Sequence, residues 1–230
     1  MKCRSLRKAT NFNILSNSTF IFIINNDAVE IPTRNKRYSL EEYFALEEKS
    51  AGKHEFHNGK IVPMSGGSIP HNKIAGNILV ALEMWIEAND LPFVVLNSDT
   101  KIRIDAYNRS VYPDVLVVCE KLEFWGGRKD IIVNPTLIVE VTSDSTEHHD
   151  RDNKFALYRS LASFKEYILV NQYKPQVESF YLQSAAESLW KITAAEGLSS
   201  SLLLPSIGFE LPLAKVYRQI PELQGVDWEG

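Results

Sequence analysis

Apolar residues recur along the chain with two different periods, and the change of period separates predicted helices from predicted strands. From Ile74 to Ile86 they recur every three or four residues, which predicts an amphipathic helix over 71–88. Short, mostly continuous apolar runs then predict strands at 93–96, 100–104, 115–118, 137–141, 166–170 and 177–182. The runs at 115–118 and 137–141 are almost entirely β-branched residues and leucine, which is typical of strands buried on both faces.

Local signals define two elements ahead of the first long helix. Ser39 followed by Glu42 has the spacing of a capping box, which predicts a helix beginning after Ser39. Asn58-Gly59 interrupts the segment 54–64, and this dipeptide favours a type I′ turn because both central residues need positive φ. A hairpin is therefore predicted there.

A second long helix is predicted over 143–161, directly after the apolar strand 137–141. Asp144 or Ser145 would be its N-cap. Its predicted core residues include Phe155, Leu157, Tyr158 and Leu161. The sequence pattern over 183–230 predicts one or two peripheral strands and a tail.

This pattern of mixed elements indicates one α/β domain. We expect an N-terminal extension at 1–35, poorly ordered or forming a covering strand, then a domain at 36–217 and a C-terminal tail at 218–230. The 230 residues suffice for one sizeable core and are few for two full domains. No internal repeat or low-complexity linker divides the chain.

Charge and cysteine content narrow the function classes. The net charge is −4, which argues against a protein that coats nucleic acid through a general basic excess. It does not exclude a nuclease, because a catalytic cleft needs only a local positive rim. The two cysteines, Cys3 and Cys119, indicate neither a disulfide framework nor a cysteine-ligated zinc site. A reducing, cytoplasmic location is the expectation that follows.

No apolar run approaches the roughly 18 residues of a membrane span, so no membrane partner is expected. Basic residues before the apolar stretch 20–24 resemble part of a secretion signal. Asn11, Asn13 and Asn17 dilute that segment, and no small-residue cleavage site follows it, so a signal peptide is not favoured.

Two acidic residues stand out against their apolar surroundings. Asp114 follows Pro113 at the mouth of the strand 115–118, and Glu140 lies inside the strand 137–141. Burying an ionised carboxylate is costly unless a cation or a proton accompanies it. If the two strands are neighbours, Asp114 and Glu140 could bind one hard cation through their oxygens. Alone, either residue would more often be a turn or a surface group.

An ordered set of short motifs spans residues 36–217. The set consists of Tyr38-Ser39-Leu40-Glu41-Glu42-Tyr43, Glu55, Asn58-Gly59-Lys60-Ile61-Val62, His71, Pro113-Asp114-Val115, Val139-Glu140-Val141-Thr142-Ser143-Asp144-Ser145-Thr146, Asp150, Lys154, Tyr158 and Glu166-Tyr167-Ile168-Leu169-Val170. In this order the sequence resembles the PD-(D/E)XK phosphodiesterase superfamily, and within it the Uma-two family of restriction-endonuclease-like proteins. The resemblance implies a restriction-endonuclease-like α/β core, in which a mixed central β-sheet is flanked by helices.

The sequence departs from the superfamily pattern two residues after Glu140, where Thr142 replaces the expected lysine. The resemblance implies that Lys154, on the following helix, takes over the role of that lysine. It also implies metal-assisted phosphodiester hydrolysis, with Mg²⁺ or Mn²⁺ held by Asp114, Glu140 and the backbone carbonyl of Val141.

The resemblance also implies that Glu55 is a catalytic residue, and that His71, Asp150 and Thr142 support the site. Glu55 resembles an additional acidic residue of the superfamily and could bind a second ion or anchor Lys154. His71 could contact a phosphate or support Glu55, and Asp150 matches an acidic position of the family. His148-His149-Asp150 also suggests zinc, but adjacent helical residues point about 100° apart and rarely share one metal.

DNA is the expected partner of such a site. A homodimer formed through an exposed edge strand is a further possibility that the sequence does not decide. Candidate substrate-binding residues are Lys53, Lys60, Lys73 and Arg128, together with Lys101, Arg103, Lys129 and the possible base-stacking residue Trp125. Two alternatives remain: a catalytically silent nucleic-acid-binding or regulatory protein on the nuclease fold, and a hydrolase of another phosphoester. Thr142 and the acidic net charge favour the first of these.

Overall fold

The computed structural model describes residues 36–142 and 153–220. The extension at 1–35, the predicted N-cap residues Asp144 and Ser145, and the acidic candidate Asp150 lie outside these residues.

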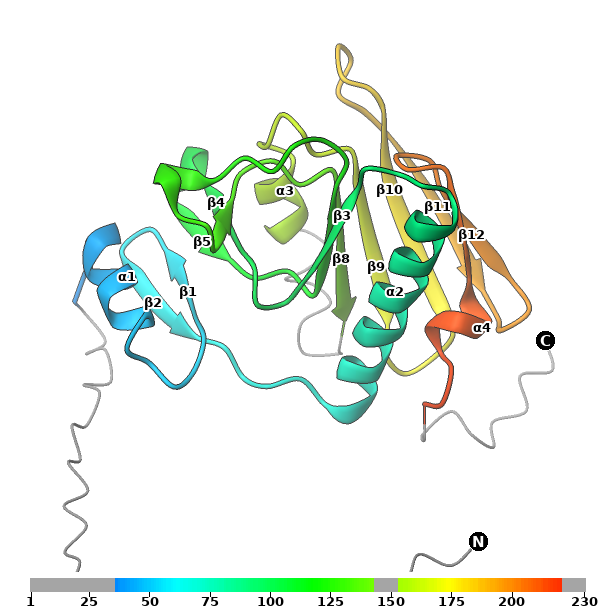
Figure 1. Ribbon diagram of the computed structural model, residues 1–230, viewed down its shortest axis with the longest axis horizontal. Helices are drawn as coiled ribbons and strands as arrows, with labels where there is room; N and C mark the ends of the chain where they lie inside the picture. The colour runs from blue at the N-terminus through cyan, green and yellow to red at the C-terminus, as the bar shows by residue number, and fades with distance from the viewer. Residues whose placement is uncertain (1–35, 143–152, 221–230) are drawn as a thin grey trace, which may run out of the picture. The chain divides into compact units, whose positions relative to one another are not determined.

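A six-stranded mixed sheet forms the centre of the domain (Figure 1). Its strand order is β11-β10-β9-β8-β6-β3, and only the pair β8–β9 is parallel. The strands are β3 (Val94–Asn97), β6 (Val115–Val118), β8 (Leu137–Thr142), β9 (Glu166–Asn171), β10 (Gln176–Ser184) and β11 (Leu189–Glu196). All residues of β6 and β8 are buried, which confirms that both faces of these strands are covered.

Alternate residues of the central strands contribute to two separate apolar clusters, one on each face of the sheet. One face packs against α2 (Ile69–Ala88), the hairpin β12–β13 (Ser201–Leu204 and Phe209–Pro212) and α4 (Leu213–Val216). The other packs against α3 (Phe155–Tyr158) and its surrounding aromatic rings. The mixed sheet flanked by helices is therefore confirmed. The C-terminal hairpin contributes more to the core than its sequence pattern indicates, because its alternate residues are buried.

The helix predicted over 71–88 is confirmed and begins two residues earlier, at Ile69. Ser68 is its N-cap, and Pro70 suits the first turn because a proline there loses no intrahelical hydrogen bond. Within 36–142 and 153–220, no helix is long and apolar enough to cross a membrane.

A second, smaller sheet has the order β2-β1-β5-β4-β7. Its strands are β1 (His54–His57), β2 (Lys60–Pro63), β4 (Lys101–Ile104), β5 (Arg109–Val111) and β7 (Ile131–Ile132), and α1 (Leu40–Glu47) packs beside β1. The predicted capping box is confirmed by both of its hydrogen bonds: the Glu42 N–H donates to Ser39 Oγ, and the Ser39 N–H donates to the Glu42 carboxylate. Asn58 (φ 47°) and Gly59 (φ 89°) both adopt the left-handed conformation, which confirms the predicted hairpin turn. The strands β5 and β7 were not predicted, and single turns of 3₁₀ helix at Asp105–Tyr107 and Trp125–Gly127 complete the connections.

One buried carboxylate lies away from the Asp114–Glu140 region and attaches the C-terminal hairpin to the main sheet. Glu166, at the start of β9, is fully buried. It accepts hydrogen bonds from Ser179 Oγ at 2.5 Å, Ser206 N at 3.0 Å and Ser206 Oγ at 2.6 Å. Burial raises the pKa of Glu166, and these hydrogen bonds only partly offset that rise.

Replacing Glu166 with glutamine is expected to make the free energy of unfolding less sensitive to pH. The folded protein holds the Glu166 proton more tightly than the unfolded chain, whose carboxyl pKa is about 4.3. The resulting stability is therefore complete below that pKa and is lost as pH rises through the raised value. Urea titrations from about pH 4 to pH 8 should show the variant gaining stability relative to the wild type as pH rises.

The matched control for this comparison is Glu210→Gln, which removes an exposed carboxylate from β13. A stability difference between Glu166→Gln and the wild type that stays constant across this pH range would contradict the expectation.

Candidate active site

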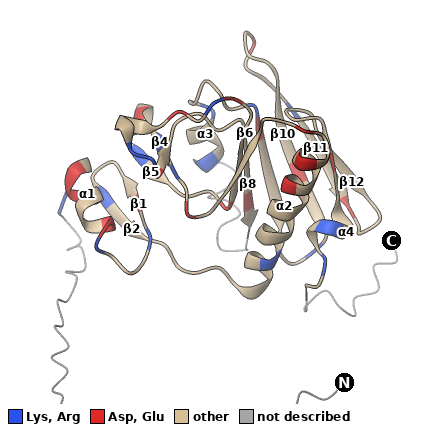
Figure 2. Cartoon of the chain, viewed as in Figure 1, with Lys and Arg blue, Asp and Glu red and all other residues tan. Residues whose placement is uncertain are grey.

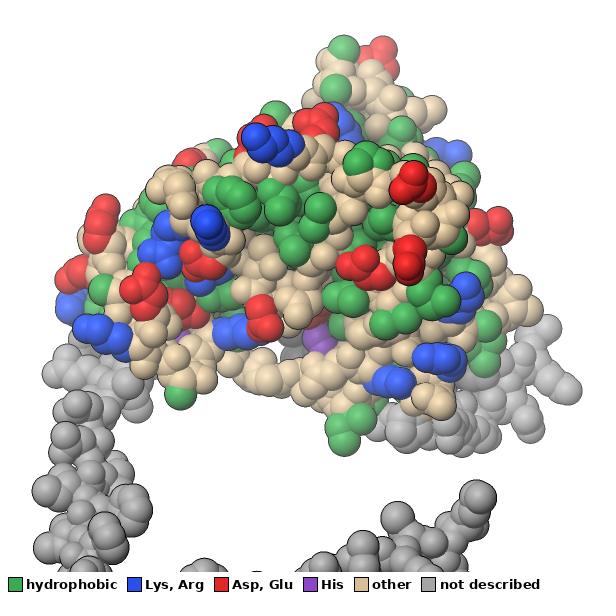
Figure 3. All heavy atoms as spheres, viewed as in Figure 1, with side chains coloured by type: hydrophobic (Ala, Val, Ile, Leu, Met, Phe, Trp, Pro, Cys, Tyr) green, Lys and Arg blue, Asp and Glu red, His purple; other side chains and the backbone are tan. Residues whose placement is uncertain are grey.

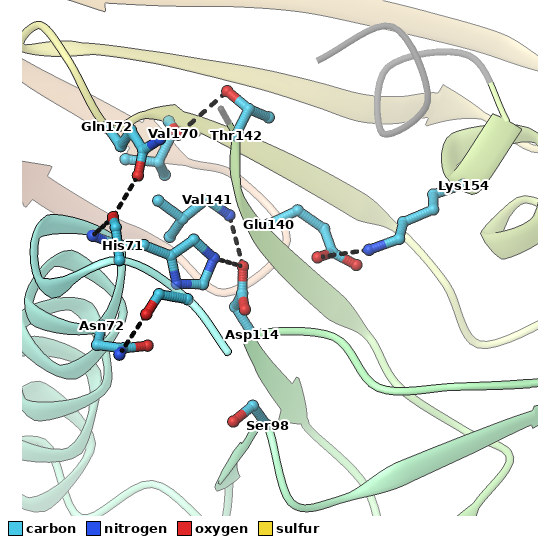
Figure 4. Close-up of polar contacts among 12 residues, drawn as sticks. His71, Asn72, Ser98, Asp114, Glu140, Val141, Thr142, Lys154, Val170 and Gln172 are labelled. Carbon is cyan, nitrogen blue, oxygen red and sulfur yellow. Dashed lines mark hydrogen bonds and ion pairs between the residues drawn. The ribbon is translucent and has the colours of Figure 1, made fainter. Parts of the chain in front are cut away.

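The two acidic residues singled out by the sequence lie at the same end of adjacent strands. β6 and β8 pair in antiparallel register with Val115 opposite Val139, so Asp114 and Glu140 occupy neighbouring positions at that end. Glu140 is only 3% exposed, whereas the side chain of Asp114 is 15% exposed. Figure 4 shows the two side chains with His71 beside Asp114 and Lys154 beside Glu140. The structure thus brings together four of the predicted site residues.

Both carboxylate oxygens of Glu140 are engaged by α3 and the turn that precedes it. Lys154 Nζ donates to Oε2 at 3.0 Å, and Tyr158 Oη donates to Oε1 at 2.8 Å. Burial, and then the negative charge of Glu140, raise the pKa of Tyr158 well above its usual range, so its hydroxyl keeps its proton. The buried charge of Glu140 is therefore compensated by one cation and one neutral donor.

Asp114 is oriented by two donors that share one of its oxygens. The backbone N–H of Val141 donates to Oδ2 at 2.7 Å, and His71 Nε2 lies 3.1 Å from the same atom. Burial lowers the pKa of His71, but the hydrogen bond to Asp114 and the charges of Asp114 and Glu140 outweigh it, so the pKa is raised. The imidazole therefore binds its proton more tightly than a free histidine does.

The start of α2 holds His71 in place. The backbone N–H of His71 donates to Ser68 Oγ at 3.2 Å, and Ser68 Oγ donates to Gln172 Oε1 at 2.8 Å. Gln172 is buried just after β9, and its N–H donates to the Thr142 carbonyl. Figure 4 shows Gln172, at the end of β9, reaching toward the start of α2.

Glu55 reaches the same region from the second sheet. Its Oε2 lies 2.7 Å from His57 Nε2. Burial raises the pKa of Glu55, but the hydrogen bond from His57, the charge of Lys154 and a hydrogen bond from the Tyr112 backbone outweigh it and lower the pKa. Glu55 therefore lies within electrostatic reach of Lys154. We expected His71 to contact phosphate or support Glu55; its carboxylate partner is instead Asp114, and His57 partners Glu55.

Thr142, which stands where the superfamily pattern has lysine, is buried at the end of β8. Its Oγ1 lies 3.4 Å from the Val170 carbonyl on β9. The side chain therefore belongs to the strand pairing, and the ammonium beside Glu140 comes from Lys154 instead.

The candidate substrate-binding residues are not gathered into one cluster. Lys53 binds the Ser98 carbonyl at 2.9 Å and Asp99 at 2.5 Å. Lys60 is exposed on β2, and Lys73 is partly exposed near the start of α2. Figure 2 shows Lys and Arg distributed over both sheets and several helices, and Figure 3 shows both charges interspersed on one face.

Several other candidate cations have structural partners. Arg128 pairs with Glu48 at 2.8 Å and Asp130 at 3.2 Å and lies over the Phe44 ring. Lys101 pairs with Asp130, and Arg103 pairs with Asp105 and lies over the Trp125 ring. Trp125 also packs on Phe44. These contacts stabilise the second sheet, so they give no support to a base-stacking role for Trp125.

The donor set suits one hard divalent ion. In the described part of the chain, no three His, Cys, Asp or Glu side chains lie close enough together to hold a metal between them. Asp114 and Glu140 nevertheless offer two carboxylates at adjacent positions. Mg²⁺ commonly binds through one or two carboxylates, substrate phosphates and several waters rather than in an all-protein cage. The residues present therefore fit Mg²⁺ or Mn²⁺ better than a closed structural zinc site.

Residues 40–214 match the model of the Uma2 family, described as "Putative restriction endonuclease". The chain belongs to this family. It is 32% identical to one uncharacterized protein of Synechocystis over 73% of this chain and 92% of that protein. A second uncharacterized Synechocystis protein is 33% identical, over 79% of this chain and 92% of its own length.

A crystal structure described as a "putative nuclease belonging to DUF820" from Anabaena variabilis has the same fold. The TM-score is 0.61 at 13% sequence identity, and the match covers 78% of this chain and 97% of the other. This similarity supports the restriction-endonuclease-like fold expected from the motifs.

Three residues of the site were not identified as functional from the sequence. Tyr158 was predicted as a core residue and belongs to the motif set, but no role in the site was assigned to it, although its spacing of four from Lys154 places both on one helix face. His57 alternates with Glu55 along β1 and so lies on the same side of the strand. No sequence pattern points to Gln172, because its contact with Ser68 joins residues 104 positions apart.

Replacing Gly67 with alanine is expected to separate His71 from Asp114. A Cβ at Gly67 would lie 2.5 Å from His71 Nδ1 and 2.7 Å from Asn72 Oδ1, so the imidazole must move. Because the contact with Asp114 raises the pKa of His71, its loss should lower that pKa toward the ordinary value of about 6.5. An NMR titration of the histidine ring signals, assigned with His71→Gln, measures the change.

Gly66→Ala is the adjacent control, since a Cβ there would meet nothing within 4 Å. An unchanged His71 titration in Gly67→Ala would show that the imidazole does not depend on this close approach.

Proposed function

We propose that this protein is a metal-dependent nuclease that hydrolyses phosphodiester bonds in DNA. The observation that carries the proposal is the meeting of Asp114 and Glu140 on adjacent strands with the ammonium of Lys154 against Glu140. The proposal of DNA as substrate takes additional support from the family description, which names a restriction endonuclease.

Asp114 and Glu140 would hold the divalent ion, with the Val141 carbonyl as an additional oxygen. Such an ion offsets negative charge on phosphoryl oxygens and makes the attacking water more acidic. The attraction between the two negative carboxylates and the divalent ion would supply much of the free energy of ion binding. Asp114 is the more accessible ligand of the two and would meet solvent first.

Lys154 would orient the attacking water or donate a hydrogen bond to the phosphoryl oxygens as their charge grows. Its stem comes from the start of α3, so it reaches Glu140 from the opposite side to His71 (Figure 4). His71 would keep Asp114 oriented through Oδ2 and leave the other oxygen of that carboxylate for the ion.

Glu55 would act on Lys154 rather than bind a second ion. Its carboxylate is already hydrogen-bonded to His57, and the charge of Lys154 lowers its pKa. A second ion at Glu55 would have to displace the hydrogen bond with His57. Removing the charge of Glu55 should therefore reduce the rate without removing the ion that Asp114 and Glu140 hold.

Asp114→Asn, Glu140→Gln and Lys154→Met are each expected to lower cleavage by about 100-fold or more, because each removes charge from the reacting centre. Glu55→Gln should lower it less. Purified variants would be incubated with plasmid and single-stranded DNA in Mg²⁺, Mn²⁺ or EDTA, with circular dichroism to confirm folding. Glu210→Gln, an exposed carboxylate on β13, is the control.

Wild-type cleavage that persists in EDTA, or in Asp114→Asn and Glu140→Gln, would contradict the proposal. Binding of Mn²⁺ and DNA without any cleavage would instead indicate the silent binding role on the same fold.

A further inference from the structure

The contact of Tyr158 with Glu140 has no part in the proposed chemistry. Lys154 and Tyr158 are four residues apart, about one helical turn, and each donates to a different oxygen of the same carboxylate. Tyr158 is fully buried, so its hydroxyl has no access to water as an alternative partner. The pair fixes the rotation of the Glu140 carboxylate and its distance from the helix at the same time.

The aromatic contacts of α3 fix the position of the helix on the sheet less sharply than a hydrogen bond does. The structure describes this helix from Phe155 to Tyr158, with Lys154 directly before it. Phe155 stacks on Tyr167 at 5.6 Å and meets the edge of Trp190 at 4.9 Å, while Tyr158 itself packs on Phe164. Apolar burial is non-directional, whereas a hydrogen bond weakens steeply when its angle changes. The hydrogen bond from the phenol to Glu140 therefore fixes the position of α3 more sharply than these aromatic contacts do.

A lysine carried on a strand two residues from the acidic residue is placed by the strand itself. Lys154 is instead placed by the packing of α3 against the sheet, and its four-carbon stem is flexible. A shift of α3 along β8 would therefore move the ammonium away from Glu140.

We infer that Tyr158 is a positioning residue, whose hydrogen bond to Glu140 sets the register of α3 against β8 and thereby places Lys154 in the site. This inference rests on the proposed function for its effect on cleavage, and on the geometry of Glu140 alone for its effect on ion binding. Tyr158 touches neither substrate nor ion, and it acts through Glu140 and Lys154.

The test compares Tyr158→Phe with Tyr43→Phe. Tyr43 is likewise fully buried, and its hydroxyl donates one hydrogen bond, to the His54 carbonyl at 2.7 Å. Both variants lose one buried hydroxyl and keep the ring, so thermal unfolding should show a similar loss of stability in each. A role that is only structural would affect cleavage equally in both.

Tyr158→Phe is expected to lower kcat by about 10- to 100-fold while KM for DNA changes less than about twofold, as loss of an outer partner of a metal ligand does. Tyr43→Phe should keep kcat within about twofold of the wild type. In a Lys154→Met background, Tyr158→Phe should have little further effect, because the residue that it places is already absent.

Calorimetric titration with Mn²⁺ provides a readout that does not depend on cleavage. Tyr158→Phe should weaken Mn²⁺ binding by about 10-fold through the released Glu140, and Tyr43→Phe should leave it unchanged. If the wild type cleaves no nucleic acid, the proposed function fails, and these affinities alone decide the role of Tyr158.

If Tyr158→Phe and Tyr43→Phe change kcat and Mn²⁺ affinity by the same factors, the inference is overturned while the proposed function stands. Losses in kcat that multiply fully in the Lys154→Met/Tyr158→Phe double variant would overturn it as well. A wild type that binds no Mn²⁺ would overturn both.

Discussion

The buried carboxylate of Glu140 is the constraint on which the rest of the site depends. It lies on an inner strand of the central sheet, between apolar neighbours on β8, where an uncompensated charge would be strongly destabilising. Lys154 and Tyr158 satisfy it from one side of the sheet. Removing either partner leaves a buried charge that is less well compensated, so the same contacts that prepare the proposed chemistry also stabilise the fold.

The two sheets contribute to the site in different ways. The central sheet places Asp114 and Glu140 by strand pairing, and α2 and α3 bring His71 and Lys154 to them from opposite faces. The second sheet delivers Glu55, whose pairing with His57 keeps a further negative charge near Lys154. Cations and carboxylates thus alternate across the site, and each carboxylate has at least one positively charged or hydrogen-bonding partner.

Much of the architecture follows from the sequence, because strong periodicity and capping signals are local. The helix beginning near His71, the hairpin at Asn58-Gly59 and the strands bearing Asp114 and Glu140 were predicted for that reason. Strands β5 and β7 have only three and two residues, too few for any period to show. The ion pairs of Arg128 and Lys101 depend on residues brought together by the second sheet, so the sequence alone could not distinguish these structural cations from substrate-binding ones. The partner of Tyr158 could not be predicted for a related reason. The sequence pattern of a buried tyrosine is the same whether or not its hydroxyl makes a functional hydrogen bond.

Anomalous X-ray scattering from crystals grown with Mn²⁺ tests most directly whether Asp114 and Glu140 are metal ligands. We predict one anomalous peak between the carboxylates of Asp114 and Glu140, and its loss in crystals of Asp114→Asn. Absence of a peak there in the wild type, with Lys154 still paired to Glu140, would contradict the assignment of these two residues as metal ligands. A peak confined to another part of the molecule would contradict it equally.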